Sequence, residues 1–280
     1  MPATINTNVA SLNAQRNFSA SQSSLATSMQ RLSSGLRINS AKDDAAGLAI
    51  AERMQAQVKG MNVAIRNAND GVSLVQTAEG ALSKVGDSLQ RMRELAVQAR
   101  NATNSSSDRD SLNKEFSALQ KEMTRVLGGT SFNGKHMLGA DGTTLQFQVG
   151  ANVTKDDIIE VKTTDMTSDT DIKAVTTGVS IDGNATVSDI GDVISAIDTA
   201  INTVNDQRAE FGAAQSRFES VISSLQQGVE AQSAARSRIM DADFAQETAN
   251  MSRAQILQQA GTAMIAQANA LPQNVLSLLR

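Results

Sequence analysis

The sequence contains no cysteine, no tryptophan and no tyrosine, and it has seven phenylalanines among its 280 residues. Without cysteine, neither a disulfide framework nor a thiolate metal site can form. An enzyme of this size normally uses aromatic rings to fill a compact core and to shape a pocket. The scarcity of rings therefore argues against an enzyme. The apolar residues are mostly Ala, Leu, Ile, Val and Met, which suits long helices packed along their length.

Helix-breaking prolines and long apolar stretches are also scarce, and the net charge is small. Pro2 and Pro272 are the two prolines, so no residue between them forces a helix to end. No stretch approaches the roughly 20 apolar residues of a membrane helix. Residues 1–6 have no basic or apolar region of the kind that begins a Sec-type signal peptide. The 25 basic and 29 acidic residues give a net charge of −4, which disfavours nucleic acid as the main partner.

The clearest pattern lies between residues 54 and 99, where apolar residues recur at alternating intervals of four and three. They are Met54, Val58, Met61, Ile65, Ala68, Val72, Val75, Ala78, Leu82, Val85, Leu89, Met92, Ala96 and Ala99. Two consecutive intervals of three, at Val72, Val75 and Ala78, form a stammer in an otherwise regular heptad repeat. The pattern predicts one helix of about 50 residues, ~75 Å long, whose apolar seam other helices must cover.

Two further segments carry helical periodicity. The first contains Leu112, Phe116, Leu119, Met123 and Val126, begins at a Ser/Asp-rich cap over residues 105–108, and stops at Gly128 and Gly129. The second contains Ile190, Ile194, Ile197, Ile201, Val204, Phe211, Phe218, Ile222, Leu225 and Val229. With the first helix they can close a bundle. The predicted fold class is therefore mainly α, an elongated bundle of long coiled-coil-like helices.

The middle of the chain has a different texture, rich in Gly, Thr, Asp and Asn. Leu145, Phe147 and Val149 alternate strictly with polar residues, and a second short apolar run lies at residues 158–161. This arrangement predicts a small β-hairpin. Residues 163–188 read as irregular surface.

The two ends carry short apolar repeats of their own, which predict a pair of antiparallel terminal helices. The segment 51–235 carries a net charge of −7, whereas the ends are only weakly charged. Short, weakly charged helices are marginal in isolation, so we expect these repeats to be seams for polymerisation with other copies. The expected seam residues are Ile5, Val9, Leu12, Leu25, Met29, Leu32, Leu257, Met264, Leu271, Val275 and Leu278.

The sequence offers no catalytic, cofactor or metal constellation. His136 is the single histidine, and it has no cysteine or carboxylate nearby at the spacing of a metal site. The glycine-rich segments lack the following Lys-Ser/Thr of a phosphate-binding loop and read as turns. Paired aspartates such as Asp43 and Asp44 read as helix caps and surface charge. We therefore expect no enzyme activity and no cofactor.

The two ends also carry long motifs of a known family. Residues 30–39, Gln-Arg-Leu-Ser-Ser-Gly-Leu-Arg-Ile-Asn, and residues 41–48, Ala-Lys-Asp-Asp-Ala-Ala-Gly-Leu, resemble the N-terminal signature of bacterial flagellins. Residues 257–262, 266–269 and 272–280 resemble the C-terminal signature. The resemblance covers roughly residues 1–165 and 190–280, and its motifs are far more specific than a short pattern.

The resemblance to flagellins implies a domain organisation and a function. Residues 1–44 with 236–280 would form a terminal coiled coil that lines the filament channel. Residues 45–162 with 189–235 would form the helical bundle with its hairpin. Residues 163–188 would be a short irregular segment, where flagellins commonly insert large variable outer domains. The implied function is that of a secreted structural subunit that self-polymerises into the extracellular bacterial flagellar filament for swimming motility.

The resemblance also implies partners. They are an export chaperone, the filament cap, hook-associated proteins, the type III flagellar export apparatus and host innate-immune receptors. Residues 30–51 are nearly identical to the flagellin epitope that plant immune receptors sense, and differ from it at Ser34, Leu36 and Ala49. Residues 90–98 with Glu115 resemble the site that the vertebrate receptor reads. The candidate receptor contacts are Arg91, Leu95, Glu115, Lys42, Asp43 and Gly47.

Two alternative functions remain open from the sequence. A protein of the hook–filament junction resembles flagellin at its ends, although the C-terminal signature here has the flagellin form. A secreted coiled-coil effector or adhesin would share the helical periodicity but would not form tubes. Electron microscopy of concentrated protein distinguishes the three.

Overall fold

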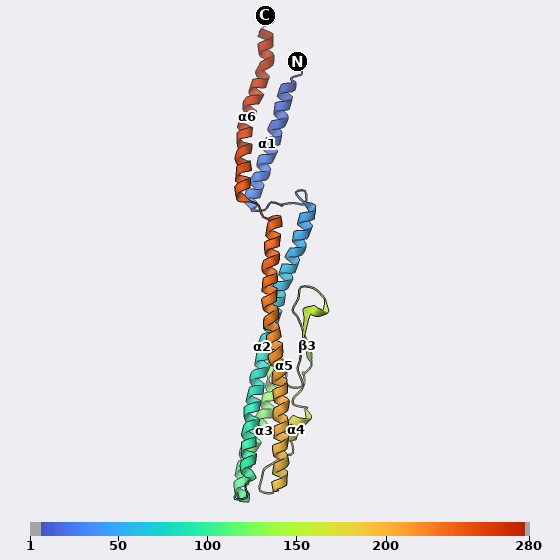
Figure 1. Cartoon of the computed structure of the whole chain (residues 1–280), viewed down its shortest axis with the longest axis vertical. Helices are drawn as coiled ribbons and strands as arrows, with labels where there is room; N and C mark the ends of the chain where they lie inside the picture. The colour runs from blue at the N-terminus through green and yellow to red at the C-terminus, as the bar shows by residue number, and fades with distance from the viewer. Residues whose placement is uncertain (1–6, 278–280) are drawn as a thin grey trace. The chain divides into compact units, whose positions relative to one another are not determined.

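The structure is a computed structural model that describes residues 7–277, with side chains up to residue 270. It is mainly α-helical, as the sequence predicts (Figure 1). The chain divides into two compact units. The first unit holds the residues up to Ala56 and from Ala231, and the second unit is Gln57–Glu230. Each unit is described by itself below.

The helices and strands follow one another in a simple order. They are α1 (Val9–Ser34), α2 (Ala45–Ala99), α3 (Ser106–Gly129), β1 (Ser131–Phe132), β2 (Lys135–His136), β3 (Thr144–Gln148), the 3-10 turn η1 (Lys155–Asp157), β4 (Ile158–Lys162), α4 (Thr170–Thr176), α5 (Val187–Met240) and α6 (Phe244–Ser277). Helices α2 and α5, with 55 and 54 residues, are the long rods that the periodicity predicts.

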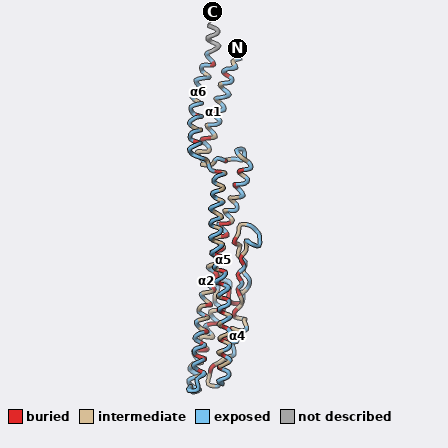
Figure 2. Tube along the Cα trace, in the orientation of Figure 1, coloured by how far each residue is buried: buried red, intermediate tan, exposed pale blue. Residues whose placement is uncertain are grey.

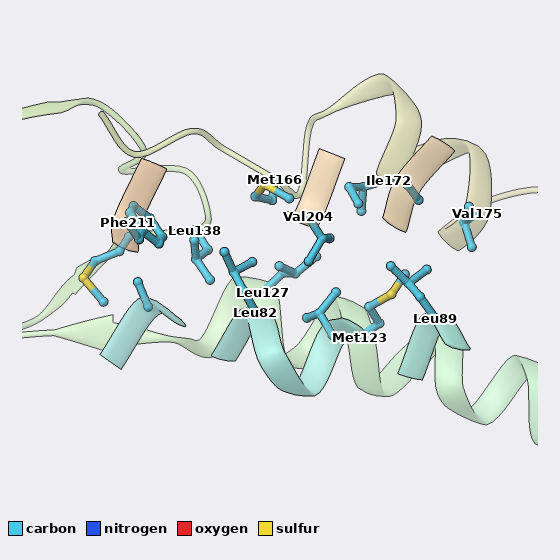
Figure 3. Packing of buried hydrophobic residues seen from close by; sticks show 14 of the residues in the cluster. Leu82, Leu89, Met123, Leu127, Leu138, Met166, Ile172, Val175, Val204 and Phe211 are labelled. Carbon is cyan, nitrogen blue, oxygen red and sulfur yellow. The ribbon is translucent and has the colours of Figure 1, made fainter. Parts of the chain in front are cut away.

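In the second unit, α2, α3 and α5 pack around one apolar core (Figures 1 and 3). The predicted seam of α2 is confirmed, because its members from Val75 to Ala99 are buried, while Ile65 and Val72 are partly buried. Leu82 and Leu89 are both 0% exposed. Met123 and Leu127 of α3 and Val204 of α5 meet them from the other helices.

Helix α3 begins where its cap residues predict. Ser105 is the N-cap, its Oγ accepts a hydrogen bond from the backbone N–H of Asp108, and the Asp108 carboxylate accepts one from the backbone N–H of Ser105. This reciprocal pair satisfies two N–H groups that the first helical turn would otherwise leave without partners.

The predicted hairpin is also confirmed. Strands β3 and β4 pair antiparallel, with Leu145 opposite Val161 and Phe147 opposite Ile159. Phe147 packs edge-on against Phe218 of α5, with 5.4 Å between ring centroids and an angle of 85° between the rings. A Cβ at Gly71 of α2 would lie 2.6 Å from the Phe218 ring, so the ring occupies space that only glycine leaves.

Two features of this unit differ from the sequence prediction. Residues 163–188 are not irregular surface, because they contain α4 and bury Met166, Ile172, Val175 and Ile181 in the core. These anchors are too irregularly spaced to show a period. A small hairpin, β1–β2, was also not predicted, and its turn residues Asn133 and Gly134 have φ angles of 50° and 80°.

In the first unit, α1 and α6 lie side by side and antiparallel (Figure 1), as the terminal repeats predict. The loop after α1 is fixed to the end of α5. The backbone N–H of Arg37 donates to the carbonyl of Met240 at 2.6 Å, and that of Ala242 donates to the carbonyl of Gly35 at 2.9 Å. Ile38, Ala51 and Met240 form a small core under this loop.

Candidate assembly and recognition surfaces

Small and polar residues form the contact between α1 and α6. Ser11, Ser21 and Ser28 of α1 are buried, as are Ala254 and Ala268 of α6. The Ser11 hydroxyl donates to the Asn269 side-chain oxygen at 2.7 Å, and the Asn8 side chain donates to the carbonyl of Ala268 at 2.8 Å. Small side chains let the two helices approach closely, but they bury little apolar area, so this contact gains little from the hydrophobic effect.

Several of the larger apolar side chains of this helix pair are exposed to solvent instead. Among the expected seam residues the exposed fractions are Val9 66%, Leu12 56%, Met29 50%, Leu257 52% and Met264 62%. Leu25 and Leu32 are partly buried. Leu271 and Val275 belong to α6, but their side chains are not described, and Ile5 and Leu278 lie outside the described residues. Figure 2 shows α1 and α6 as mostly exposed along their length.

Two further exposed apolar residues extend this surface and were not predicted from the sequence. Ile256 is 66% exposed and Phe244 is 57% exposed. The C-terminal repeat, as read from residue 264 onward, starts too late to include them. A search for apolar residues flanking Leu257 would have found Ile256.

A groove runs between α1 and α6. Its apolar part has a volume of about 660 Å³ and is lined by Phe18, Leu257 and Met264 together with alanines of both helices. Beside it lies a polar part of about 380 Å³, which contains Arg31, Glu247 and Arg253. A nitrogen of the Arg31 guanidinium lies 3.9 Å from a carboxylate oxygen of Glu247. The exposed apolar residues and this groove together form what we call the α1/α6 surface.

The loop between α1 and α2 holds the other candidate residues of the N-terminal motif. The Asp43 carboxylate accepts hydrogen bonds from the backbone N–H groups of Ser40 at 2.9 Å and Asn39 at 3.1 Å. These bonds, with that from Ser40 the strongest, lower the pKa of Asp43 below its ordinary value. Lys42 and Asp43 are both exposed. They can therefore meet a partner.

Gly47 has a structural role at the start of α2. The backbone N–H of Gly47 donates to the Asp44 carboxylate at 2.8 Å. A Cβ at this position would lie 2.4 Å from the same carboxylate and 2.9 Å from the Ile38 side chain. Gly47 is buried, and the absence of a side chain lets Asp44 and Ile38 pack against the start of α2.

Arg91 and Glu115, the candidate receptor contacts that the resemblance implies, lie together on the surface of the second unit. The Arg91 Nε donates to the Glu115 carboxylate at 2.8 Å, and an Arg91 terminal nitrogen donates to Glu94 at 2.8 Å. These hydrogen bonds, that to Glu115 the stronger, raise the pKa of Arg91. Arg93 points to α5 and binds Asp198 at 2.7 Å.

Leu95 does not belong to this exposed face. Its side chain is 1% exposed and packs in the core of the second unit. The expectation that it offers an apolar contact beside Arg91 does not hold in this structure. The three-helix core covers more of α2 than the heptad seam alone, so Leu95, adjacent to Ala96, is buried as well.

No candidate for chemistry emerges from the part of the chain that the structure describes. His136 is exposed, and residues 7–277 contain no group of His, Cys, Asp and Glu side chains that could hold a metal ion. Within the same residues, no helix combines the length and hydropathy that a membrane span requires.

Both the N-terminal and the C-terminal regions of the chain match models of a known protein family. Residues 5–143 match the model of the bacterial flagellin N-terminal helical region, and residues 194–279 match that of the C-terminal helical region. A flagellin of Halalkalibacterium halodurans is 45% identical over 276 residues, which cover 99% of both chains. A flagellin of Xenorhabdus nematophila is 44% identical, with 100% of both chains covered. A flagellin of Bacillus subtilis is 43% identical, with 99% of both chains covered.

Proposed function

The chain belongs to the bacterial flagellin family, the structural subunits of the flagellar filament, and we propose that its copies polymerise through the α1/α6 surface. The observation that supports this proposal is the placement of side chains in the first unit, which is the reverse of that in a normal core. Small polar side chains hold the two helices together, while Val9, Leu12 and Met264 are more than half exposed. In a lone subunit this apolar area faces water.

The energetic consequence favours assembly. Full burial of a Leu, Val or Met side chain contributes ~1.5–3 kcal/mol. The five exposed seam residues are 50–66% exposed, so burial of the area that still faces water can contribute about 4–9 kcal/mol per copy before the cost of association. A contact in which one surface meets a different surface of the next copy propagates as an open helical array. The acidic second unit, with its apolar residues inside, keeps the remaining surface soluble.

The assignment of domains follows from the same argument. We propose that residues 1–44 with 236–280 form the inner tube of the filament. Residues 45–162 with 189–235 then form the surrounding bundle. Residues 163–188 form the short segment that joins residue 162 to residue 189, and this segment packs on the core of the bundle. No observation favours the hook–filament junction protein or the secreted effector.

A pair of substitutions tests the role of the α1/α6 surface. We expect Leu257→Ser combined with Met264→Ser to prevent filament formation in electron micrographs, because both side chains are exposed and line the groove. The control is Gln259→Ser, an exposed polar position on the same helix. Circular dichroism checks that the monomer keeps its helical content. If the double variant forms long filaments at the wild-type concentration, the α1/α6 surface does not drive polymerisation.

Truncation gives a second test. Deletion of residues 1–40 or 245–280 should leave a folded, monomeric bundle, because the core of the second unit is built from residues 68–218. Helical content should fall only by the removed segments. Long filaments formed by either truncated chain would contradict the proposal.

Other partners are proposed from the family. They include export through the type III flagellar apparatus with a chaperone, and contacts with the filament cap and hook-associated proteins. We also propose that host receptors read Arg91 and Glu115, whose side chains are 48% and 47% exposed and already held in one geometry by their hydrogen bond. The exposed Lys42 and Asp43 form a second candidate receptor site.

A further inference from the structure

The loop that joins β3 to β4 is a turn closed by side-chain hydrogen bonds, with an apolar side chain at its apex. Val153 is 100% exposed. The Gln148 side chain donates to the carbonyls of Gly150 at 3.0 Å and Asn152 at 2.6 Å. The Asp157 carboxylate accepts from the backbone N–H of Thr154 at 3.1 Å and from its hydroxyl. These hydrogen bonds therefore fix the backbone on both sides of Val153.

The exposed Val153 side chain does not stabilise the fold, but it is available to bind a partner. A side chain that is fully exposed contributes no core packing, whereas a loop already constrained by its own hydrogen bonds loses less entropy when it binds. Lys155 lies two residues further on and is exposed, and among the described residues its side chain has no hydrogen bond or ion pair. Val153 and Lys155 together form what we call the hairpin tip.

A groove of matching character lies near the start of α5. It has a volume of about 580 Å³, and its apolar lining residues are Ala174, Val179, Ala185, Val193 and Ala196. Asp182 and Asp189 border it, but their carboxylates hold the backbone N–H groups of Asn184 and Thr186. Asp192 also borders the groove and is exposed, and its carboxylate has no hydrogen bond or ion pair within the described part of the chain. We call this the α4/α5 groove.

The hairpin tip and the α4/α5 groove lie at opposite ends of the second unit (Figure 1). A Cβ at Gly60 of α2 would lie 2.9 Å from the Cβ of Ala151, which is beside the tip. A Cβ at Gly191, which is beside the groove, would lie 3.7 Å from the Arg100 side chain. Residue 60 lies within α2, and residue 100 directly follows its last residue. The 40 residues between them span ~60 Å at ~1.5 Å per residue. One subunit therefore cannot place its own tip in its own groove.

We infer that the hairpin tip of one copy docks in the α4/α5 groove of a second copy, with Val153 among the alanines and valines and Lys155 facing Asp192. This inference rests on the proposed function, in which copies of the chain polymerise. The two surfaces are different, so the contact is heterologous and continues from copy to copy without closing. It predicts an axial repeat of about 60 Å between neighbouring copies, or somewhat less if the rods tilt.

Disulfide trapping tests the contact directly, because the chain contains no cysteine of its own. We expect full-length protein carrying Val153→Cys and Ala196→Cys to give, after assembly and mild oxidation, a ladder of covalent multimers on a denaturing gel. A disulfide needs Cα atoms within roughly 7 Å, so the ladder cannot arise within one subunit. The matched control combines Val153→Cys with Lys121→Cys, an exposed position on α3, and should give no ladder.

Charge exchange provides an independent measurement. Lys155→Glu and Asp192→Lys should each raise the critical concentration for assembly roughly tenfold, equivalent to about 1.4 kcal/mol. The double variant should have a critical concentration within about threefold of the wild-type value, because Glu at position 155 then faces Lys at position 192 and an ion pair is formed again. Asp156→Asn, in the same loop, is the control and should not raise it.

The outcomes separate this inference from the proposed function. If wild-type protein does not assemble at all, the proposed function fails. If wild-type protein assembles but the Val153/Ala196 pair gives no ladder, or the two charge variants add with no rescue, the inference fails and polymerisation through α1 and α6 stands.

Discussion

Two glycines of the same helix should respond oppositely to the addition of one methyl group. Gly71 and Gly80 both lie inside α2, where glycine is less favourable than alanine by ~0.8–1.0 kcal/mol. A Cβ at Gly80 would have nothing within 4 Å, whereas a Cβ at Gly71 would lie 2.6 Å, 2.9 Å and 3.0 Å from three atoms of the Phe218 ring. Gly80→Ala should therefore stabilise the protein by roughly 0.5–1 kcal/mol.

Gly71→Ala should destabilise it, because the Phe218 ring has little room to retreat. The ring is 0% exposed and rests edge-on against Phe147 of the hairpin. Overpacking of this kind costs ~1–3 kcal/mol, which exceeds the gain in helix propensity. The net loss should be about 0.5–2 kcal/mol, so the two variants should differ by ~1–3 kcal/mol.

Urea unfolding of the full chain, followed by circular dichroism, measures both changes. A difference of this size corresponds to several degrees in Tm for a unit of this length. Phe218→Leu in the Gly71→Ala background should recover part of the loss, since the smaller side chain leaves space for the methyl group. Equal stability of Gly71→Ala and Gly80→Ala would refute the close approach of α2 to Phe218.

Three other predictions follow from the same structure. Leu89→Ala should cost ~2–5 kcal/mol in urea unfolding, because Leu89 is 0% exposed; a loss under about half a kcal/mol would place it at the surface. Hydrogen bonds from Ser105 and Thr186 lower the pKa of Asp108 and Asp189, so these carboxylates stabilise the fold above their unfolded pKa of about 4 and lose this effect as pH falls through the folded values. Replacing both with Asn, which still caps, should flatten the stability profile below about pH 4. Arg91→Ala should weaken receptor binding more than Arg93→Ala, as surface plasmon resonance can measure.

The periodicity of α2 predicts its seam well, because the seam residues of nearly every heptad pack against other helices. It underestimates the width of the buried stripe. Leu74 beside Val75, and Leu95 beside Ala96, are buried together, since α2 meets other helices on two sides. A heptad reading assumes a single narrow contact and leaves Leu95 at the surface.

The residues that hold irregular segments could not be found from a period. Met166, Ile172 and Val175 enter the core from a mostly polar stretch. The Gln120 side chain of α3 donates to the carbonyls of Val175 and Val179 at 2.7 and 3.2 Å. A polar residue on an amphipathic helix normally reads as solvent-facing, so its role as the anchor of a distant backbone is visible only once the chain has folded.

The sequence shows that each terminal helix has an apolar repeat, but it does not show which face of the helix is turned towards the other helix. The small residues between α1 and α6 decide this. An apolar repeat predicts that a face will be covered, but it does not say by which molecule. Ser21 and Ser28 are seven residues apart and buried in the first unit, so they take the inner face of α1. Larger apolar residues such as Val9, Leu12 and Met29 are thereby left exposed, where a second copy can cover them. In the second unit the order is reversed, with Leu82 and Leu89 inside and charged pairs such as Arg93 with Asp198 outside. The same chain thus combines a unit whose core side chains are covered within one subunit with a unit that leaves several large apolar side chains exposed. If copies polymerise through the α1/α6 surface, as proposed, loss of that surface should abolish filaments while the bundle remains folded.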